Sequence, residues 1–309
     1  MLRYILRRCA MLVPVLLGVV FIVFLMLYVT PDDPARMVLG EQAPQADVDN
    51  LRQEMGLNDP FLVQFGRYVY KAVVEGDIGR SYITKRPVLN ELMAAFPVTL
   101  KLSALAMGIA LLVGIPCGIV TAVKQYSIFD NIVTLFALIG ISMPVFWLGL
   151  LMILLFTVKL NWLPPSGFDS FDAMIMPAAT LGLQSVAIIT RMTRSSMLEV
   201  VRQDYICTAR AKGQKESVVI RKHALPNALV PVVTIAGIQF GILLGGAVLT
   251  EIIFSLPGLG RLMVSSIEMR DYPMVQGGVL FIALAFCLVN LGVDLLYAWL
   301  DPRIKSQYV

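Results

Sequence analysis

The sequence contains 309 residues, of which 58% are hydrophobic and only 15% are charged. This composition is too apolar for a soluble domain and predicts a polytopic membrane protein. The net charge of +4 is explained by basic loops beside anionic lipid, so nucleic acid is not implied as a partner.

Six stretches lack Asp, Glu, Lys and Arg over lengths close to or above the roughly 20 residues that cross a bilayer as a helix. A backbone that faces lipid must satisfy its own hydrogen bonds, so each stretch is predicted to be helical and the fold class all-α. Pro116 and Pro144 are expected to bend the second and third stretches. The stretches run 9–31, 102–123, 131–158, 173–190, 223–250 and 272–293.

The first stretch follows Arg3, Arg7 and Arg8, as the apolar region of a signal peptide would. However, it has 23 uncharged residues, and no clear small-x-small cleavage site follows it. We therefore predict a retained signal anchor.

The orientation is predicted from the distribution of Lys and Arg. With the N-terminus inside, segments 1–8, 124–130, 191–222 and 301–309 hold 14 basic residues in 56 positions. The segments then outside, 32–101, 159–172 and 251–271, hold 11 in 105. This bias places both termini in the cytoplasm.

The long external segment is expected to contain two amphipathic helices. Residues 47–57 place Val48, Leu51 and Met55 on one helical face, with Gly56 as a stop. Residues 61–74 form the second candidate. Both helices would lie at the outer membrane interface or pack over the outer ends of the spans, and the sequence does not separate these alternatives. The 159–172 loop adds turn residues and an interfacial tryptophan.

The segment 204–226, DYICTARAKGQKESVVIRKHALP, is predicted to form a helix, a glycine turn and a second helix. Asp204 is a candidate N-cap, and Gly213 suits the left-handed conformation that ends a helix. Ser217 is a candidate cap for the second helix, and Pro226 suits the start of the next span. Chemistry alone leaves open a plain basic loop that follows the positive-inside rule.

Glycines spaced four apart on the fifth stretch predict close approach of another helix. They are Gly237, Gly241 and Gly245, and Gly114-x-x-x-Gly118 on the second stretch is a weaker copy. This pattern indicates helix packing and does not suggest a catalytic or binding role.

Two acidic residues lie near the ends of spans, Glu251 at the outer end of the fifth and Asp294 near the inner end of the last. Intramembrane acids are functional hypotheses, such as a proton relay. We favour an interfacial position for both residues, in which each carboxylate reaches headgroup water.

Motifs for catalysis and for metal binding are missing from the sequence. It contains no G-x-x-x-x-G-K-[ST], no H-E-x-x-H and no G-x-S-x-G. Its four cysteines are dispersed, which suggests neither disulfides nor a zinc site, and His223 is its only histidine. We therefore expect no enzyme activity, no metal and no cofactor in this chain.

The 204–226 segment resembles the cytoplasmic signature of permease subunits of bacterial ABC importers, Glu-Ala-Ala, three residues, Gly, then Ile-x-Leu-Pro. Ala209, Gly213, Leu225 and Pro226 match it, whereas Cys207, Thr208 and His223 replace the Glu, the first Ala and the Ile. These departures are usual in the peptide/nickel branch, whose loop is similar to Y-x-x-T-A-R-A-K-G.

Further motifs of that branch recur along almost the whole chain. They are Pro31-Asp32-Asp33-Pro34 with Asp32 for Gly, Gly56-Leu57-Asn58-Asp59-Pro60, Gly76-Asp77-Ile78-Gly79, Glu251-x-x-Phe254-x-x-Pro257-Gly258-Leu259-Gly260, Arg270-Asp271-Tyr272-Pro273 and Asp301-Pro302-Arg303. The combination resembles the first of the two permeases of a dipeptide/oligopeptide importer, with glutathione and nickel permeases as relatives.

The resemblance implies a type I ABC importer permease of the inner membrane with six spans. Residues 1–95 would hold the anchor and external segment, 96–300 the transmembrane core with its coupling loop 191–226, and 301–309 a cytoplasmic tail. Its implied partners are a second permease, two cytoplasmic ATPases that bind ATP and Mg, and an external binding protein that delivers peptide.

The resemblance also assigns roles to residues. The ATPase-coupling residues would be Tyr205, Thr208, Ala209, Arg210, Lys212, Gly213, Leu225 and Pro226. The external turn would comprise Glu251, Phe254, Pro257, Gly258 and Gly260. Glutathione and nickel chelates remain alternative substrates. A secondary transporter and a membrane scaffold remain alternative classes of protein, although no feature of the sequence specifically indicates either one.

Overall fold

The fold comes from a computed structural model, which describes residues 2–30, 33–40, 42–168 and 170–300, with side chains from 10 to 293 within those ranges. The described residues are helical apart from turns, loops and one isolated bridge between Arg80 and Pro87. The helices are α1 (Leu2–Val29), α2 (Pro34–Leu39), α3 (Gln45–Met55), α4 (Phe61–Tyr70), α5 (Val88–Val123), α6 (Ile128–Ser142), α7 (Val145–Met152), α8 (Phe171–Val201), α9 (Asp204–Ala211), α10 (Glu216–Val218), α11 (Leu225–Gly246), α12 (Val248–Ile253), α13 (Leu259–Glu268) and α14 (Tyr272–Leu300). Three π-helical segments, Lys71–Glu75, Ile153–Lys159 and Val219–Ala224, extend α4 and α7 and precede α11.

Five described helices are long and apolar enough to cross a membrane, or six spans result if the bent pair of α6 and α7 is counted as one. The predicted spans 9–31, 102–123, 173–190, 223–250 and 272–293 fall mainly on α1, α5, α8, α11 and α14. The all-α polytopic fold expected from the sequence is therefore confirmed.

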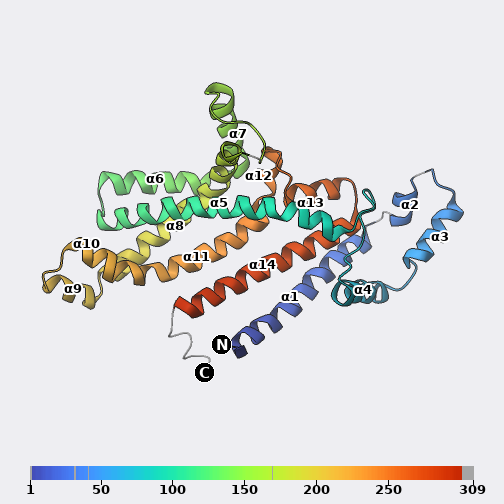
Figure 1. Cartoon of the computed structure of the whole chain (residues 1–309), viewed down its shortest axis with the longest axis horizontal. Coiled ribbons are helices and arrows are strands. Elements are labelled where there is room, and N and C mark those ends of the chain that lie inside the picture. Colours follow the sequence, from blue (N-terminus) through green and yellow to red (C-terminus); the bar gives the residue numbers. More distant parts are fainter. Residues whose placement is uncertain (1, 31–32, 41, 169, 301–309) are drawn as a thin grey trace. The chain divides into compact units, whose positions relative to one another are not determined.

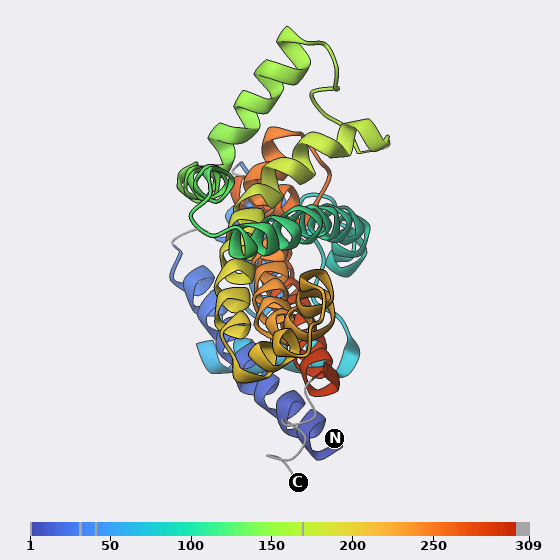
Figure 2. The same ribbon diagram turned by 90° about the vertical axis from the view of Figure 1, so that its left-hand side faces the viewer.

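The third predicted span, 131–158, is not one continuous helix. α6 ends at Ser142, α7 begins at Val145, and the two axes differ by 107° (Figures 1 and 2). Met143 is extended, with ψ of 127°, because a residue before proline is disfavoured in the helical region. Pro144 therefore breaks the span rather than bending it, whereas α5 continues as one helix past Pro116.

The chain divides into two compact units, one formed by residues 98–256 and 288–300 and the other by 2–97 and 257–287. Helices α5 and α14 each contribute residues to both units.

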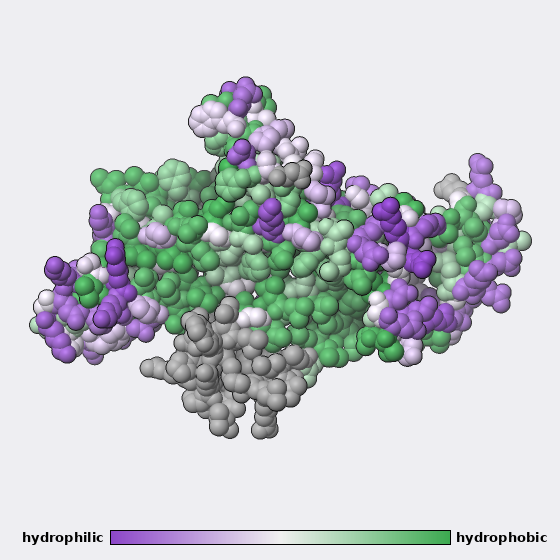
Figure 3. Space-filling view, viewed as in Figure 1, coloured by the Kyte–Doolittle hydropathy of each residue, from purple (hydrophilic) through white to green (hydrophobic). Residues whose placement is uncertain are grey.

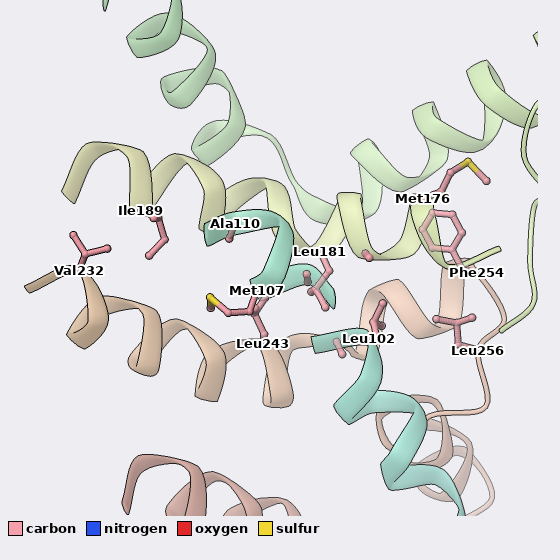
Figure 4. Close-up of a cluster of buried hydrophobic side chains, with 13 residues drawn as sticks. Leu102, Met107, Ala110, Met176, Leu181, Ile189, Val232, Leu243, Phe254 and Leu256 are labelled. Carbon is pink, nitrogen blue, oxygen red and sulfur yellow. The ribbon is translucent and has the colours of Figure 1, made fainter. Parts of the chain in front are cut away.

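The core of the first unit lies between α5, α8 and α11. The buried apolar side chains drawn in Figure 4 include Leu102, Met107 and Ala110 of α5, Met176, Leu181 and Ile189 of α8, and Val232 and Leu243 of α11. Small residues allow α5 and α8 to approach. A Cβ on Gly118 would lie 2.7 Å from the backbone oxygen of Thr190, and one on Gly182 would lie 2.7 Å from that of Ala106.

The second unit is held together by aromatic rings and a small apolar core. Phe21 and Phe24 of α1 make edge-on contacts with Phe61 and Phe65 of α4 at centroid distances of 5.4–5.7 Å. Such edge-to-face pairs suit the charge distribution of aromatic rings. A separate cluster joins Val88, Leu92 and Ala95 of α5 to Leu259 of α13 and Met274 of α14.

The two helices predicted in the external segment are present as α3 and α4. α3 ends at Gly56, which adopts φ of 67°, as predicted for a glycine stop. Pro31, Asp32, the Asp301-Pro302-Arg303 motif, the 301–309 tail and the side chain of Asp294 lie outside the described residues.

Candidate functional site

The helical loop, residues 204–226, has the predicted order of helix, glycine turn and helix. α9 ends in a Schellman arrangement, in which Gly213 N–H donates to the carbonyl of Arg210 at 2.9 Å and Gln214 N–H to that of Ala209 at 3.4 Å. This arrangement requires a left-handed residue, and Gly213 has φ of 76°. A Cβ on Gly213 would meet nothing within 4 Å, so the backbone angle is what favours glycine.

Two capping predictions for the loop are wrong. Asp204 is the first residue of α9, and Gln203 occupies the cap position without a side-chain hydrogen bond. Ser217 lies inside α10, which Lys215 precedes. In both cases the helix begins one or two residues earlier than the polar side chain suggested, so the acidic Asp204 and Glu216 lie in the first turns, where the helix dipole favours negative charge.

The loop is anchored on a small apolar core. Ile206 of α9 is fully buried and Ala209 nearly so, and they belong to one cluster with Met197 of α8, Val219 and Ala224. Because Ile206 and Ala209 are three residues apart, they lie on the same face of α9. This face fixes α9 against the end of α8 and the segment that leads into α11.

Three polar contacts then tie α9 and the turn to residues 216–227, which comprise the second half of the loop and the first residues of α11. Arg210 donates to Glu216 through Nε at 3.1 Å and Nη2 at 2.7 Å, and this hydrogen bond raises the pKa of Arg210. A bidentate pair of this kind fixes geometry as well as charge.

The other two contacts involve no carboxylate. His223 Nε2 lies 2.8 Å from Oε1 of Gln214. Asn227 donates its amide to the hydroxyl of Tyr205 at 3.1 Å and to the carbonyl of His223 at 3.1 Å. The role of His223 and Asn227 was not visible in the sequence, because no pattern relates them to their partners.

The opposite face of α9 is exposed. Cys207, Thr208, Ala211 and Lys212 are all exposed on it. Figure 3 shows hydrophilic residues gathered over α9 and α10, whereas α5 and α6 present hydrophobic surface. Of the predicted coupling residues, Thr208 and Lys212 therefore lie on a free face, while Tyr205 and Arg210 bind within the loop. Ala209 is buried, and Leu225 and Pro226 begin α11.

The predicted packing glycines lie on α11. A Cβ on Gly237 would collide with the side chain of Val293 of α14, whereas one on Gly245 would meet nothing within 4 Å. Gly241 is buried. The weaker copy on α5, Gly114 and Gly118, makes the closer backbone approach, to α8.

The predicted external turn contains a buried carboxylate rather than an interfacial one. Glu251 is fully buried and accepts a hydrogen bond from Thr99 Oγ1 at 2.6 Å. The prediction that its carboxylate reaches headgroup water is therefore wrong. Phe254 is also fully buried. The remaining residues of the predicted turn belong to the second unit. Pro257 is the first of them, Gly258 is the residue before α13, and Gly260 lies in the first turn of α13.

Two buried contacts of acidic residues correspond to no motif of the sequence. Arg194 of α8 donates to both carboxylate oxygens of Asp130 at 2.9 Å. In the second unit, Ser81 donates to Asp271, which also accepts the backbone N–H of Tyr82 at 3.0 Å. The latter contact joins the Arg270–Pro273 motif to residues 81–82, which lie just after the Gly76–Gly79 motif.

Within the described side chains, no three His, Cys, Asp or Glu residues form a group suited to a metal ion.

Comparison with protein families gives two matches. Residues 114–306 match the family described as binding-protein-dependent transport system inner membrane component. Residues 1–103 match the N-terminal family of the same membrane component.

Two similar curated proteins come from bacteria. The dipeptide transport system permease protein DppB of Alkalihalophilus pseudofirmus is 45% identical, with 99% of this chain and 100% of the relative covered. The glutathione transport system permease protein GsiC of Pectobacterium atrosepticum is also 45% identical, with the same coverage.

Two solved structures share the fold at low sequence identity. The inward-facing MetNI methionine ABC transporter has a TM-score of 0.59 and 21% identity, covering 69% of this chain and 97% of the other. An amino acid ABC transporter with histidines has a TM-score of 0.53 and 17% identity, covering 70% and 94%.

Proposed function

We propose, from the premise that this chain belongs to the family of binding-protein-dependent transport system inner membrane components, that it carries short peptides into the cell. Members of this family are permease subunits of ABC importers, and this chain is such a subunit, a multi-pass protein of the inner membrane. It is the channel subunit rather than the enzymatic one.

The substrate class rests on one observation. The similarity to a dipeptide permease extends over 99% of this chain at 45% identity, so it includes the external segment and the core alike. The equally similar glutathione permease makes glutathione, itself a tripeptide, the second candidate. Both candidates have a peptide backbone and free carboxylates.

We further propose that the helical loop couples the pore to a cytoplasmic ATPase. Its apolar core, the Arg210–Glu216 pair and the Tyr205–Asn227 contact make it a rigid unit attached to α8 and α11. A rigid unit can transmit a displacement, whereas a flexible loop would absorb it. The exposed face around Thr208 and Lys212 is the part left to contact the ATPase.

The proposed transport cycle follows from these contacts. This chain would form half of the pore with a second, similar permease, and an external binding protein would deliver the peptide. Closure of two ATPase subunits around ATP would move the helical loops and turn the pore outward, and hydrolysis would return it inward. This is rigid-body switching driven by different ATP affinities of the two states.

Uptake measurements test the substrate class. In cells that lack the gene and carry it back on a plasmid, we expect restored accumulation of radiolabelled dialanine, with glutathione measured alongside. Accumulation should stop when ATP is depleted and persist when the proton gradient alone is collapsed. Uptake that follows the gradient and ignores ATP would exclude the proposal.

Co-purification tests the partners. The tagged chain, extracted from its native membrane in mild detergent, should retain a second permease and ATPase subunits. Cys207 is exposed on the proposed docking face, so its labelling by a maleimide should be slower in the complex than in the separated chain. Equal labelling rates in the complex and in the separated chain would show that the ATPase does not cover the face of α9 that contains Cys207.

A further inference from the structure

The second unit contains a cavity of about 860 Å³. Its walls come from the C-terminal end of α1, from α2, α3 and α4, from residues 78–85 and from the start of α14. The volume lies within the range of small-molecule sites. None of the residues of the helical loop lines this cavity.

The cavity has a strongly basic lining. Five basic side chains line it, against a single carboxylate, that of Asp33. Asp33 is already engaged, because Arg52 donates to it at 2.9–3.0 Å and Ala35 N–H donates to it at 3.2 Å. Arg67 is likewise neutralised by Asp59.

Three of the five basic side chains therefore remain uncompensated. Lys71, Arg80 and Lys85 line the cavity, and none of them has an ion-pair partner within the part of the chain that the structure describes. All three side chains are exposed, so water and salt screen their mutual repulsion, but together they give the cavity a positive potential that attracts anions. The lining thus favours an anionic ligand.

A neutral donor lies in the same cavity. The hydroxyl of Tyr68 is buried and has no hydrogen-bond partner among the described residues, and Tyr68 lines the cavity with its ring 6.0 Å from that of Phe24. Burial raises the pKa of Tyr68 to about 12, so its hydroxyl keeps the proton that it can donate. A buried hydroxyl without a partner is costly, and an acceptor on a ligand would remove that cost.

The rest of the wall is apolar. Leu27 of α1, Leu51 and Met55 of α3, Leu57 and Ile78 all line the cavity. A ligand that suits this lining has one anionic end and an uncharged or apolar body. A short peptide supplies the anion as its C-terminal carboxylate. Its N-terminal ammonium would remain in solvent, because the single carboxylate of the lining is already paired with Arg52.

We propose that this cavity binds a short peptide by its C-terminal carboxylate, with Lys71, Arg80 and Lys85 as the cationic partners and the Tyr68 hydroxyl as a neutral donor. The inference rests on the proposed function for the choice of peptide. It adds a peptide site on the permease itself, within the unit that holds the external segment. Such a site would hold the peptide after it leaves the binding protein.

Calorimetry on the full chain tests the proposal. The chain is placed in phosphatidylcholine nanodiscs without binding protein or ATPase, and titrated with dialanine and with dialanine amide. We expect dialanine to bind and the amide, which lacks the carboxylate, to bind at least about tenfold more weakly, since a hydrogen bond to a charged group contributes roughly that factor.

Variants locate the binding site. Lys85→Gln and Arg80→Gln should each raise the Kd for dialanine about tenfold, and Tyr68→Phe, which removes only the hydroxyl, should raise it severalfold. Arg86→Gln is the matched control, because Arg86 is an exposed neighbour that does not line the cavity. Its Kd should equal that of the unmodified chain.

Three outcomes would overturn the site. They are equal binding of dialanine and its amide, no binding of dialanine, and an effect of Arg86→Gln as large as that of Lys85→Gln. Phosphatidylglycerol that is retained by the chain and lost in Lys85→Gln, with no peptide binding, would assign the cavity to a lipid headgroup instead. Dipeptide uptake by intact cells is measured separately, so uptake without binding would reject this site and leave the proposed function standing.

Discussion

Glu216 accepts two hydrogen bonds from the guanidinium of Arg210, across the glycine turn of the helical loop. Both side chains are more than one-third exposed, at 38% for Arg210 and 52% for Glu216, so the pair contributes little to overall stability. Its geometric effect is larger, since it fixes the end of α9 to the start of α10. The pair therefore bears on coupling more than on folding.

The first prediction is that Arg210→Glu lowers ATP-driven uptake severalfold without changing the amount of chain in the membrane. The charge reversal places two carboxylates beside each other at the turn and frees α9 from α10. The double variant Arg210→Glu with Glu216→Arg restores the pair with opposite polarity and should recover much of the uptake. Unchanged uptake in the single variant, or no recovery in the double one, would contradict the role given to the pair.

Gly213 gives a second prediction that separates backbone conformation from side-chain size. Gly213→Val should abolish coupling, because a β-branched residue in the left-handed region costs about 1–2 kcal/mol or more and opens the Schellman turn. Gly213→Asn should retain most uptake, since Asn tolerates that region and no atom lies within 4 Å of the added Cβ. Uptake and ATPase rate in proteoliposomes measure the two effects. Equal loss in both variants would show that the site excludes any side chain.

The sequence was sufficient to predict the features that depend on neighbours along the chain. The apolar stretches predicted the spans, and the glycines at 56 and 213 predicted left-handed helix ends, because both signals are local. Pro144 predicted a bend, yet the 107° break depends on how α7 packs against α8 and α12. No residue or short motif near Pro144 predicts the size of that angle.

Contacts between distant residues were not predictable in the same way. Asp130 and Arg194 are 64 positions apart, and Ser81 and Asp271 are 190 apart. Each of these residues alone resembles an ordinary polar residue of a loop or a helix end. The interfacial position predicted for Glu251 is wrong for the same reason. Its carboxylate is buried beside Thr99, and this contact exists only because α5 and α12 pack together in the fold.

The glycines provide a matched test of helix packing. Gly118→Ala should lower the free energy of unfolding by about 1–3 kcal/mol, because its Cβ would lie 2.7 Å from the carbonyl oxygen of Thr190, a backbone atom that cannot turn away. Gly245→Ala adds the same methyl group where nothing lies within 4 Å and should leave stability unchanged or slightly higher, since alanine favours a helix. Thermal unfolding in detergent measures both. A similar response of the two variants would contradict the close approach of α5 and α8.

The last prediction concerns alkaline pH and Tyr82. Burial, and then the negative charge of Asp271, raise the pKa of Tyr82 to about 12 in the folded chain, against about 10 for an unfolded tyrosine. Above pH 10 the unfolded chain therefore loses a proton that the folded chain keeps, and the free energy of unfolding falls as the pH rises. The stabilisation is complete below pH 10 and is lost between about pH 10 and 12.

Tyr82→Phe removes this titration. Its unfolding midpoint should fall less steeply than that of the unmodified chain between about pH 10 and 12, with a difference on the order of 2 kcal/mol at the upper end. Tyr126→Phe is the control, because Tyr126 is 82% exposed and its removal should leave the slope unchanged. Parallel slopes for Tyr82→Phe and the unmodified chain would show that Tyr82 ionises equally in both states, and the buried contact of residues 81–82 with Asp271 would then not persist in solution.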